Sequence, residues 1–156
     1  MRFVTVFAFL LVYLTSVESA LCKEVPTFWL RSLEGKRFDS RKQEQPYVLS
    51  FFFVNCVPCI KEIPALYQLM KSEFPETPLL FIDPLKEDSK KEIARFAKRL
   101  KVPLSYFYRD SFGVVSKKFF KGKIVFPTII GIKGKEYQFK SNQFDDETAS
   151  MILNLY

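Results

Sequence analysis

The chain has 156 residues, a length that fits one domain, and 48% of them are hydrophobic, enough for a core that needs no metal or structural disulfide. It contains no histidine, which excludes histidine-ligated metal sites and catalysis in which a histidine activates a serine or cysteine. The net charge of +7 accompanies no nucleic-acid-binding motif, so we expect no nucleic-acid partner; solvated surface, an acidic partner or an anionic membrane can account for it.

Residues 1–20 have the pattern of a secretory signal, because one positive charge precedes about a dozen mostly apolar residues, fewer than the ~20 of a membrane span. Val17 and Ser19 suit the positions before a cleavage site. An uncleaved membrane anchor and lipidation of Cys22 are the alternatives. Each of these three interpretations places the remaining domain, 25–156, in the periplasm or cell envelope, where disulfides persist.

Short apolar runs separated by turn residues fill the first part of this domain. Residues 47–54 are apolar almost throughout, as in a strand buried on both faces. The spacing predicts, in chain order, a strand at 27–30, a hairpin at 33–38 around Glu34–Gly35, the strand at 47–54 and a helix from 57 to about 73. The inward side of this helix is expected to comprise Ile60, Ile63, Tyr67, Met70 and Phe74, with a bend at Pro64.

The second part alternates strands and helices. Ser89 and Glu92 have the spacing of a capping box at the start of a helix that ends near Lys101. The other predicted elements are strands at 78–83, 104–108, 127–132 and 136–139, a short helix capped by Asp110, and a last helix from Asp145 or Asp146 with Ala149, Ile152, Leu153 and Tyr156 inward. The order predicts an α/β fold with a mixed central sheet and helices on both faces.

Two cysteines lie three residues apart where the buried strand gives way to the first helix. At a helix N-terminus, unpaired backbone N–H groups and the helix dipole favour an anion, so the Cys56 thiol should ionise readily. We expect its sulfur to be exposed and that of Cys59, one turn further on, to be more buried. Cys56 would then attack a disulfide and Cys59 would resolve the mixed disulfide. A zinc half-site is the rival interpretation, but the chain lacks ligands to complete it.

The run from Cys56 to Pro64 resembles the TlpA/ResA branch of extracytoplasmic thioredoxins, whose pattern is C-x-P-C-x-x-E-x-P. The resemblance covers residues 27–139. It implies a thioredoxin-like fold with an N-terminal β-hairpin and a helix inserted after the strand that ends at Asp83. It also implies a redox-active Cys56–Cys59 disulfide with no other cofactor and no metal.

Further site residues follow from this resemblance. Glu62 would tune the thiols or relay a proton, although a solvated helix carboxylate is the alternative. Pro127 would be cis and lie against the disulfide, unless it is an ordinary proline at the start of a strand. The residues implied in substrate binding are Phe126, Pro127, Asn55, Val57 and Pro58.

The sequence departs from the family pattern around these residues. Asn55 stands where the family usually has tryptophan, and Ser50 where cytoplasmic thioredoxins have a buried aspartate. Val125 and Phe126 replace a frequent glycine and a smaller residue. We therefore expect a more apolar partner groove and a larger role for Glu62.

The leading hypothesis is an extracytoplasmic thiol:disulfide oxidoreductase that reduces protein disulfides and is reset by a membrane thiol donor, with cytochrome c maturation as the family's suggested setting. The direction of electron flow stays open, because the two residues between the cysteines do not determine it. The alternatives are a thiol peroxidase, against which Phe53 argues, and a non-catalytic thioredoxin-like binding module.

Overall fold

A five-stranded mixed sheet forms the centre of the computed structural model, which describes residues 24–156. The strand order is β5-β4-β3-β6-β7, with β3 (Tyr47–Phe51), β4 (Leu79–Asp83), β5 (Phe107–Arg109), β6 (Thr128–Lys133) and β7 (Glu136–Ser141). The pairs β3–β4 and β4–β5 are parallel, while β3–β6 and β6–β7 are antiparallel. Every residue of β3 and β4 is buried, as the continuous apolar runs in the sequence predict.

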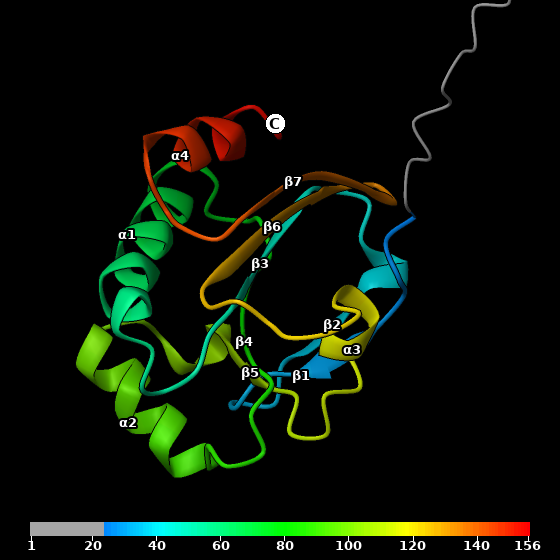
Figure 1. The fold of residues 1–156 in the computed structure, drawn as a ribbon. Helices are drawn as coiled ribbons and strands as arrows, with labels where there is room; N and C mark the ends of the chain where they lie inside the picture. Colours follow the sequence, from blue (N-terminus) through cyan, green and yellow to red (C-terminus); the bar gives the residue numbers. More distant parts are fainter. Residues whose placement is uncertain (1–23) are drawn as a thin grey trace, which may run out of the picture.

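Helices cover both faces of the sheet, as predicted (Figure 1). The apolar cluster on one face joins the sheet to α1 (Val57–Glu73), α2 (Lys90–Leu100) and α4 (Asp146–Leu153). The cluster on the other face joins it to α3 (Ser116–Phe119) and to a two-stranded hairpin of β1 (Trp29–Arg31) and β2 (Arg37–Asp39). The predicted capping box opens α2, where the Ser89 side chain accepts from the Glu92 N–H and the Glu92 side chain accepts from the Ser89 N–H.

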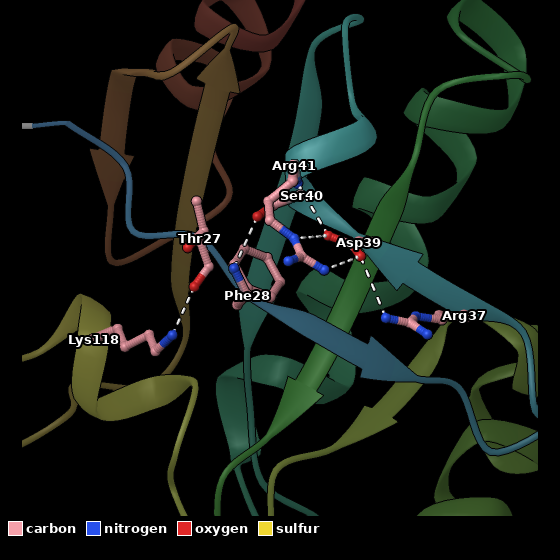
Figure 2. Close-up of polar contacts among 7 residues, drawn as sticks. All are labelled: Thr27, Phe28, Arg37, Asp39, Ser40, Arg41 and Lys118. Carbon is pink, nitrogen blue, oxygen red and sulfur yellow. Dashed lines mark hydrogen bonds and ion pairs between the residues drawn. The ribbon is translucent and has the colours of Figure 1, made fainter.

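The N-terminal hairpin is fastened by polar contacts at its base (Figure 2). Asp39 receives two hydrogen bonds from the Arg41 guanidinium, at 2.9 and 2.7 Å, and these hold the pKa of its carboxyl well below the ordinary range. The Phe28 N–H donates to the Ser40 hydroxyl at 2.9 Å. Lys118 of the segment containing α3 donates to the Thr27 carbonyl. The hairpin is thereby held against the face of the sheet that α3 also covers.

Several element boundaries differ from the predictions. The strand expected at 47–54 ends at Phe51, because the chain turns toward α1; the strand expected at 104–108 begins as a 3-10 turn (Leu104–Tyr106) before β5. The strands expected at 27–30, 127–132 and 136–139 are β1, β6 and β7 with boundaries shifted by up to two residues. Asp110, expected to cap α3, is not its N-cap residue, which is Val115, but the Asp110 carboxylate accepts from the Val115 N–H at 3.0 Å and the Ser116 N–H at 2.7 Å.

Two predicted helix faces are partly wrong. On α1, Ile60 is exposed, Tyr67 and Phe74 are half-buried, and Leu66 takes a core position instead. At the end of α4 and just after it, Leu155 is buried, whereas Leu153 and Tyr156 are exposed. Neighbouring segments decide these faces: the Tyr156 ring stacks on Phe74 at the end of α1, with ring centroids 3.9 Å apart. Within residues 24–156, no helix combines the length and apolar character needed to cross a bilayer.

Gly131 of β6 offers a test of this packing. It lies opposite Phe139 of β7, and a Cβ atom at this position would overlap the Phe139 ring. Gly131→Ala should therefore lower the free energy of unfolding by about 1–3 kcal/mol, measured by urea denaturation. Gly122→Ala is the matched control, because a Cβ there meets no atom within 4 Å. Equal stability of the two variants would contradict the described β6–β7 packing.

Candidate active site

The junction between β3 and α1 positions the two cysteines. Cys56 is the N-cap residue of α1, with extended backbone angles (φ −72°, ψ 104°), and its sulfur accepts from the Cys59 N–H at 3.3 Å. Pro58 lies in the first turn, where its missing N–H leaves no intrahelical hydrogen bond unmade. The predicted placement of the first cysteine at a helix N-terminus is confirmed.

Cys56 and Cys59 form a disulfide, and their Cα atoms are 5.3 Å apart. The expectation that Cys56 is exposed and Cys59 more buried is wrong for this oxidised form, because the residues are 1% and 0% exposed. Asn55, Val57 and Pro58, all predicted to contact a partner, are exposed.

The loop before β6 approaches this junction from the distant end of the chain. The Phe126–Pro127 peptide bond is cis, as the family resemblance implied. The Phe126 ring packs edge-on against Phe53, with ring centroids 5.1 Å apart, and it also borders the apolar cluster that contains both cysteines. Phe53 and Phe126 therefore bring the cis-proline loop next to the segment that leads into Cys56.

Glu62 projects from α1 toward the segment before α4. Its Oε2 accepts from the Phe144 N–H at 2.9 Å. Burial raises the pKa of Glu62, and the nearby Asp145 carboxylate raises it further, while the Phe144 hydrogen bond opposes the change. Glu62 is half-buried and holds the Phe144 N–H. It is therefore not the fully solvated helix carboxylate of the alternative interpretation.

A second carboxyl near the junction was not among the residues that sequence reasoning selected. Asp83 ends β4 and is fully buried, and its Oδ1 accepts from the Leu85 N–H at 2.8 Å. Burial raises the pKa of Asp83 to about 8, and the Asp88 carboxyl adds to the shift. The available signal was a single acidic residue at the end of an otherwise apolar strand.

Two hollows on the described surface differ in the residues that line them. The larger, of about 730 Å³, lies between β1 and the segment around α3 and contains neither cysteine in its lining. Two of its five basic residues, Arg41 and Lys118, already bind Asp39 and the Thr27 carbonyl. The other, of about 400 Å³, is lined by Leu85, Ile124, Phe126 and neighbouring residues, and so borders the cis-proline loop. Its lining includes Phe126 but not Val125.

Metal ligands do not gather in the part of the chain that the structure describes: no group of three or more Cys, Asp or Glu side chains there could hold an ion. Cys22 and the predicted signal at residues 1–20 lie outside the described residues.

The buried Asp83 carboxyl should make stability depend on pH. Its pKa is about 8 in the folded chain and ~3.9 in an unfolded one, so the folded state holds an extra proton between these values. This contribution to the free energy of unfolding is complete below pH ~4 and is lost as pH rises toward ~8. Asp83→Asn should remove it, so that the variant gains stability relative to wild type across this range in urea denaturation. A parallel pH dependence in both proteins would contradict the burial of an acidic Asp83.

The fold resembles those of known proteins, although the sequence matches none of the families compared. No protein-family model matches the sequence, and no curated protein matches it. A solved structure of a secreted Mycobacterium tuberculosis disulfide oxidoreductase, described as homologous to E. coli DsbE, has a TM-score of 0.68 and 19% identity over 81% of this chain and 95% of its own.

Two further solved structures have folds similar to that of this chain. A thiol:disulfide interchange protein of the thioredoxin family from Chlorobium tepidum TLS has a TM-score of 0.70 and 18% identity, covering 85% of this chain and 96% of its own. StoA from Bacillus subtilis has a TM-score of 0.64 and 19% identity, covering 84% and 96%. Together with the mixed sheet, the N-terminal hairpin and the helix inserted after β4, these similarities show that the chain has a thioredoxin-like fold.

Proposed function

We propose that this protein is a thiol:disulfide oxidoreductase that works outside the cytoplasm and reduces disulfides in partner proteins. The observation that carries the proposal is the Cys56–Cys59 disulfide at the N-terminus of α1, beside the loop that holds the cis Phe126–Pro127 bond. Similar structures, one described as a secreted disulfide oxidoreductase and one as a thiol:disulfide interchange protein, support it. The TlpA/ResA-like motif suggests envelope proteins, including apocytochrome c, as the partner class.

The reaction transfers two electrons from the Cys56/Cys59 dithiol to a partner disulfide. The Cys56 thiolate attacks one sulfur of the partner disulfide, forming a mixed disulfide and releasing the first partner thiolate. The Cys59 thiolate then attacks the Cys56 sulfur, which releases the second partner thiolate and leaves the Cys56–Cys59 disulfide. A membrane thiol donor reduces this disulfide for the next cycle, and an N-terminal anchor or a lipidated Cys22 would keep the domain near it.

The α1 N-terminus lowers the free energy of the attacking thiolate, because the first-turn N–H groups and the helix dipole stabilise negative charge. The Cys59 N–H already points at the Cys56 sulfur, at 3.3 Å. Glu62, whose pKa is raised by burial, accepts the proton that Cys59 must lose before it attacks. The exposed Asn55, Val57 and Pro58 and the groove at Phe126 receive the partner chain.

The Cys59→Ser variant, which lacks the resolving sulfur, tests which cysteine attacks the partner disulfide first. Cys59→Ser should accumulate mixed disulfides with envelope proteins, visible as reducible adducts on gels, because the second exchange step cannot occur. Cys56→Ser should trap none, and it serves as the matched control. Adducts formed equally by both variants would contradict the assigned order. No adducts from Cys59→Ser, with function intact in Cys56→Ser cells, would favour a non-catalytic binding module.

Equilibration with glutathione decides between reductant and oxidant. We expect a reduction potential of about −200 mV or lower for the Cys56–Cys59 pair, in the range of reducing thioredoxin-like proteins. A potential close to about −120 mV would overturn the assignment as a reductant. Turnover of peroxide by the reduced protein would indicate a thiol peroxidase instead.

Two substitutions of Glu62 separate its proton transfer from its structural contact. Glu62→Gln keeps an oxygen that can accept from the Phe144 N–H but cannot take a proton, so release of the mixed disulfide should slow by about 100-fold near neutral pH. Glu62→Ala removes both and should also lower thermal stability. Stopped-flow measurement of the resolving step checks this, and an unchanged rate in Glu62→Gln would exclude the relay.

A further inference from the structure

Asp83 lies on the same face of the sheet as the disulfide. Alternate residues of a strand point to the same face, so Asp83 shares its face with Phe81, which belongs to the apolar cluster that contains both cysteines. β4 runs beside β3, and the Phe52 N–H donates to the Ile82 carbonyl at 3.1 Å just before the chain turns toward Cys56. Asp83 therefore lies at the C-terminal end of β4, next to the end of β3 from which the chain turns toward Cys56.

The Asp83 carboxyl is only half satisfied. Oδ1 accepts from the Leu85 N–H, but Oδ2 is buried and has no hydrogen-bond partner within residues 24–156. A buried carboxylate oxygen without a donor is costly, whereas a protonated one becomes a donor that needs an acceptor. Two charged groups act on Asp83: the Asp88 carboxyl, which favours its protonated form, and the Arg109 guanidinium, which opposes this.

Asp88, the carboxyl that favours the protonated form of Asp83, also contacts the active-site segment. Its Oδ2 accepts from the Val54 N–H at 2.9 Å, a contact that spans 34 residues of sequence. The loop that carries Asp88 is itself held by Arg109, whose Nε donates to the Asp88 carbonyl at 2.8 Å and whose Nη2 donates to the Lys86 carbonyl at 3.0 Å. Two residues after Val54 comes Cys56, whose N–H donates to the Phe53 carbonyl at 3.1 Å and closes the turn.

We propose that Asp83, acting through Asp88, is a positioning residue for Cys56. The protonated Asp83 donates to the Asp88 carboxylate and leaves the other Asp88 oxygen to hold the Val54 N–H. When Asp83 loses its proton, two carboxylates face each other, and their repulsion weakens the hold on Val54. This inference deepens the proposed function, because it concerns the geometry of the attacking cysteine, and it rests on that function.

The oxidised protein gives a clean test of the contact. The chain has no histidine and neither disulfide cysteine titrates, so apart from the Cys22 thiol and the α-amino group few groups change charge between pH 6 and 9.5. We expect the Val54 amide resonance to shift with an inflection close to pH 8 in an NMR titration. Asp83→Asn should lack the inflection, since its amide donates at every pH, and Asp146→Asn, an exposed carboxyl on α4, should keep it.

Asp88→Ala supplies a second variant in case Asp83→Asn does not fold, and it too should abolish the inflection at Val54. An inflection that persists in either variant, or its absence in wild type, would overturn the proposal.

The catalytic readout is the rate at which reduced Cys56 reacts with a small disulfide. We expect Asp88→Ala to react about tenfold more slowly than wild type, because the segment before Cys56 loses its hold. Asp83→Asn should retain the wild-type rate below pH ~7 and exceed it above pH ~8, where wild-type Asp83 ionises. Identical pH–rate profiles for wild type and Asp83→Asn would overturn the inference while leaving the proposed function intact. Failure of wild type itself to exchange disulfides would instead refute the proposed function.

Discussion

The structure depends on one constraint: a fully buried strand ends and a helix begins within six residues, and the first cysteine is the cap between them. A helix N-terminus leaves backbone N–H groups without intrahelical partners, and a sulfur placed there can accept from them. Cys56 does so by accepting from the Cys59 N–H. The same turn brings the second sulfur within bonding reach, so capping and redox chemistry use one local geometry.

Three distant segments hold this junction in place. The loop before β6 contacts it through the Phe126 and Phe53 rings, and the segment before α4 is tied to α1 by Glu62. The loop after β4 reaches it through Asp88 and Val54. Because each contact comes from a different part of the chain, the junction is complete only when these three segments have packed against it.

The absence of histidine leaves carboxyl groups as the proton-exchanging side chains near the site. Ser50 is buried in β3 and pairs in register with Phe81 on the neighbouring strand. Asp83 stands two residues further along that strand, on the same face. Burial raises the pKa of both Asp83 and Glu62, so the site keeps acidic groups that can hold a proton closer to neutral pH.

Local patterns in the sequence determined the order of strands and helices, the capping box at Ser89 and the cysteine at the start of α1, because spacing and capping act over a few residues. The motif's family resemblance supplied the cis bond before Pro127. Only the tertiary structure decided that Cys56 is buried in the disulfide, that Leu155 replaces Tyr156 in the core, that Asp83 is fully buried and that Asp88 binds the Val54 N–H. These features depend on contacts between segments that are far apart in the sequence. Local patterns of spacing and capping in a single sequence do not predict such contacts.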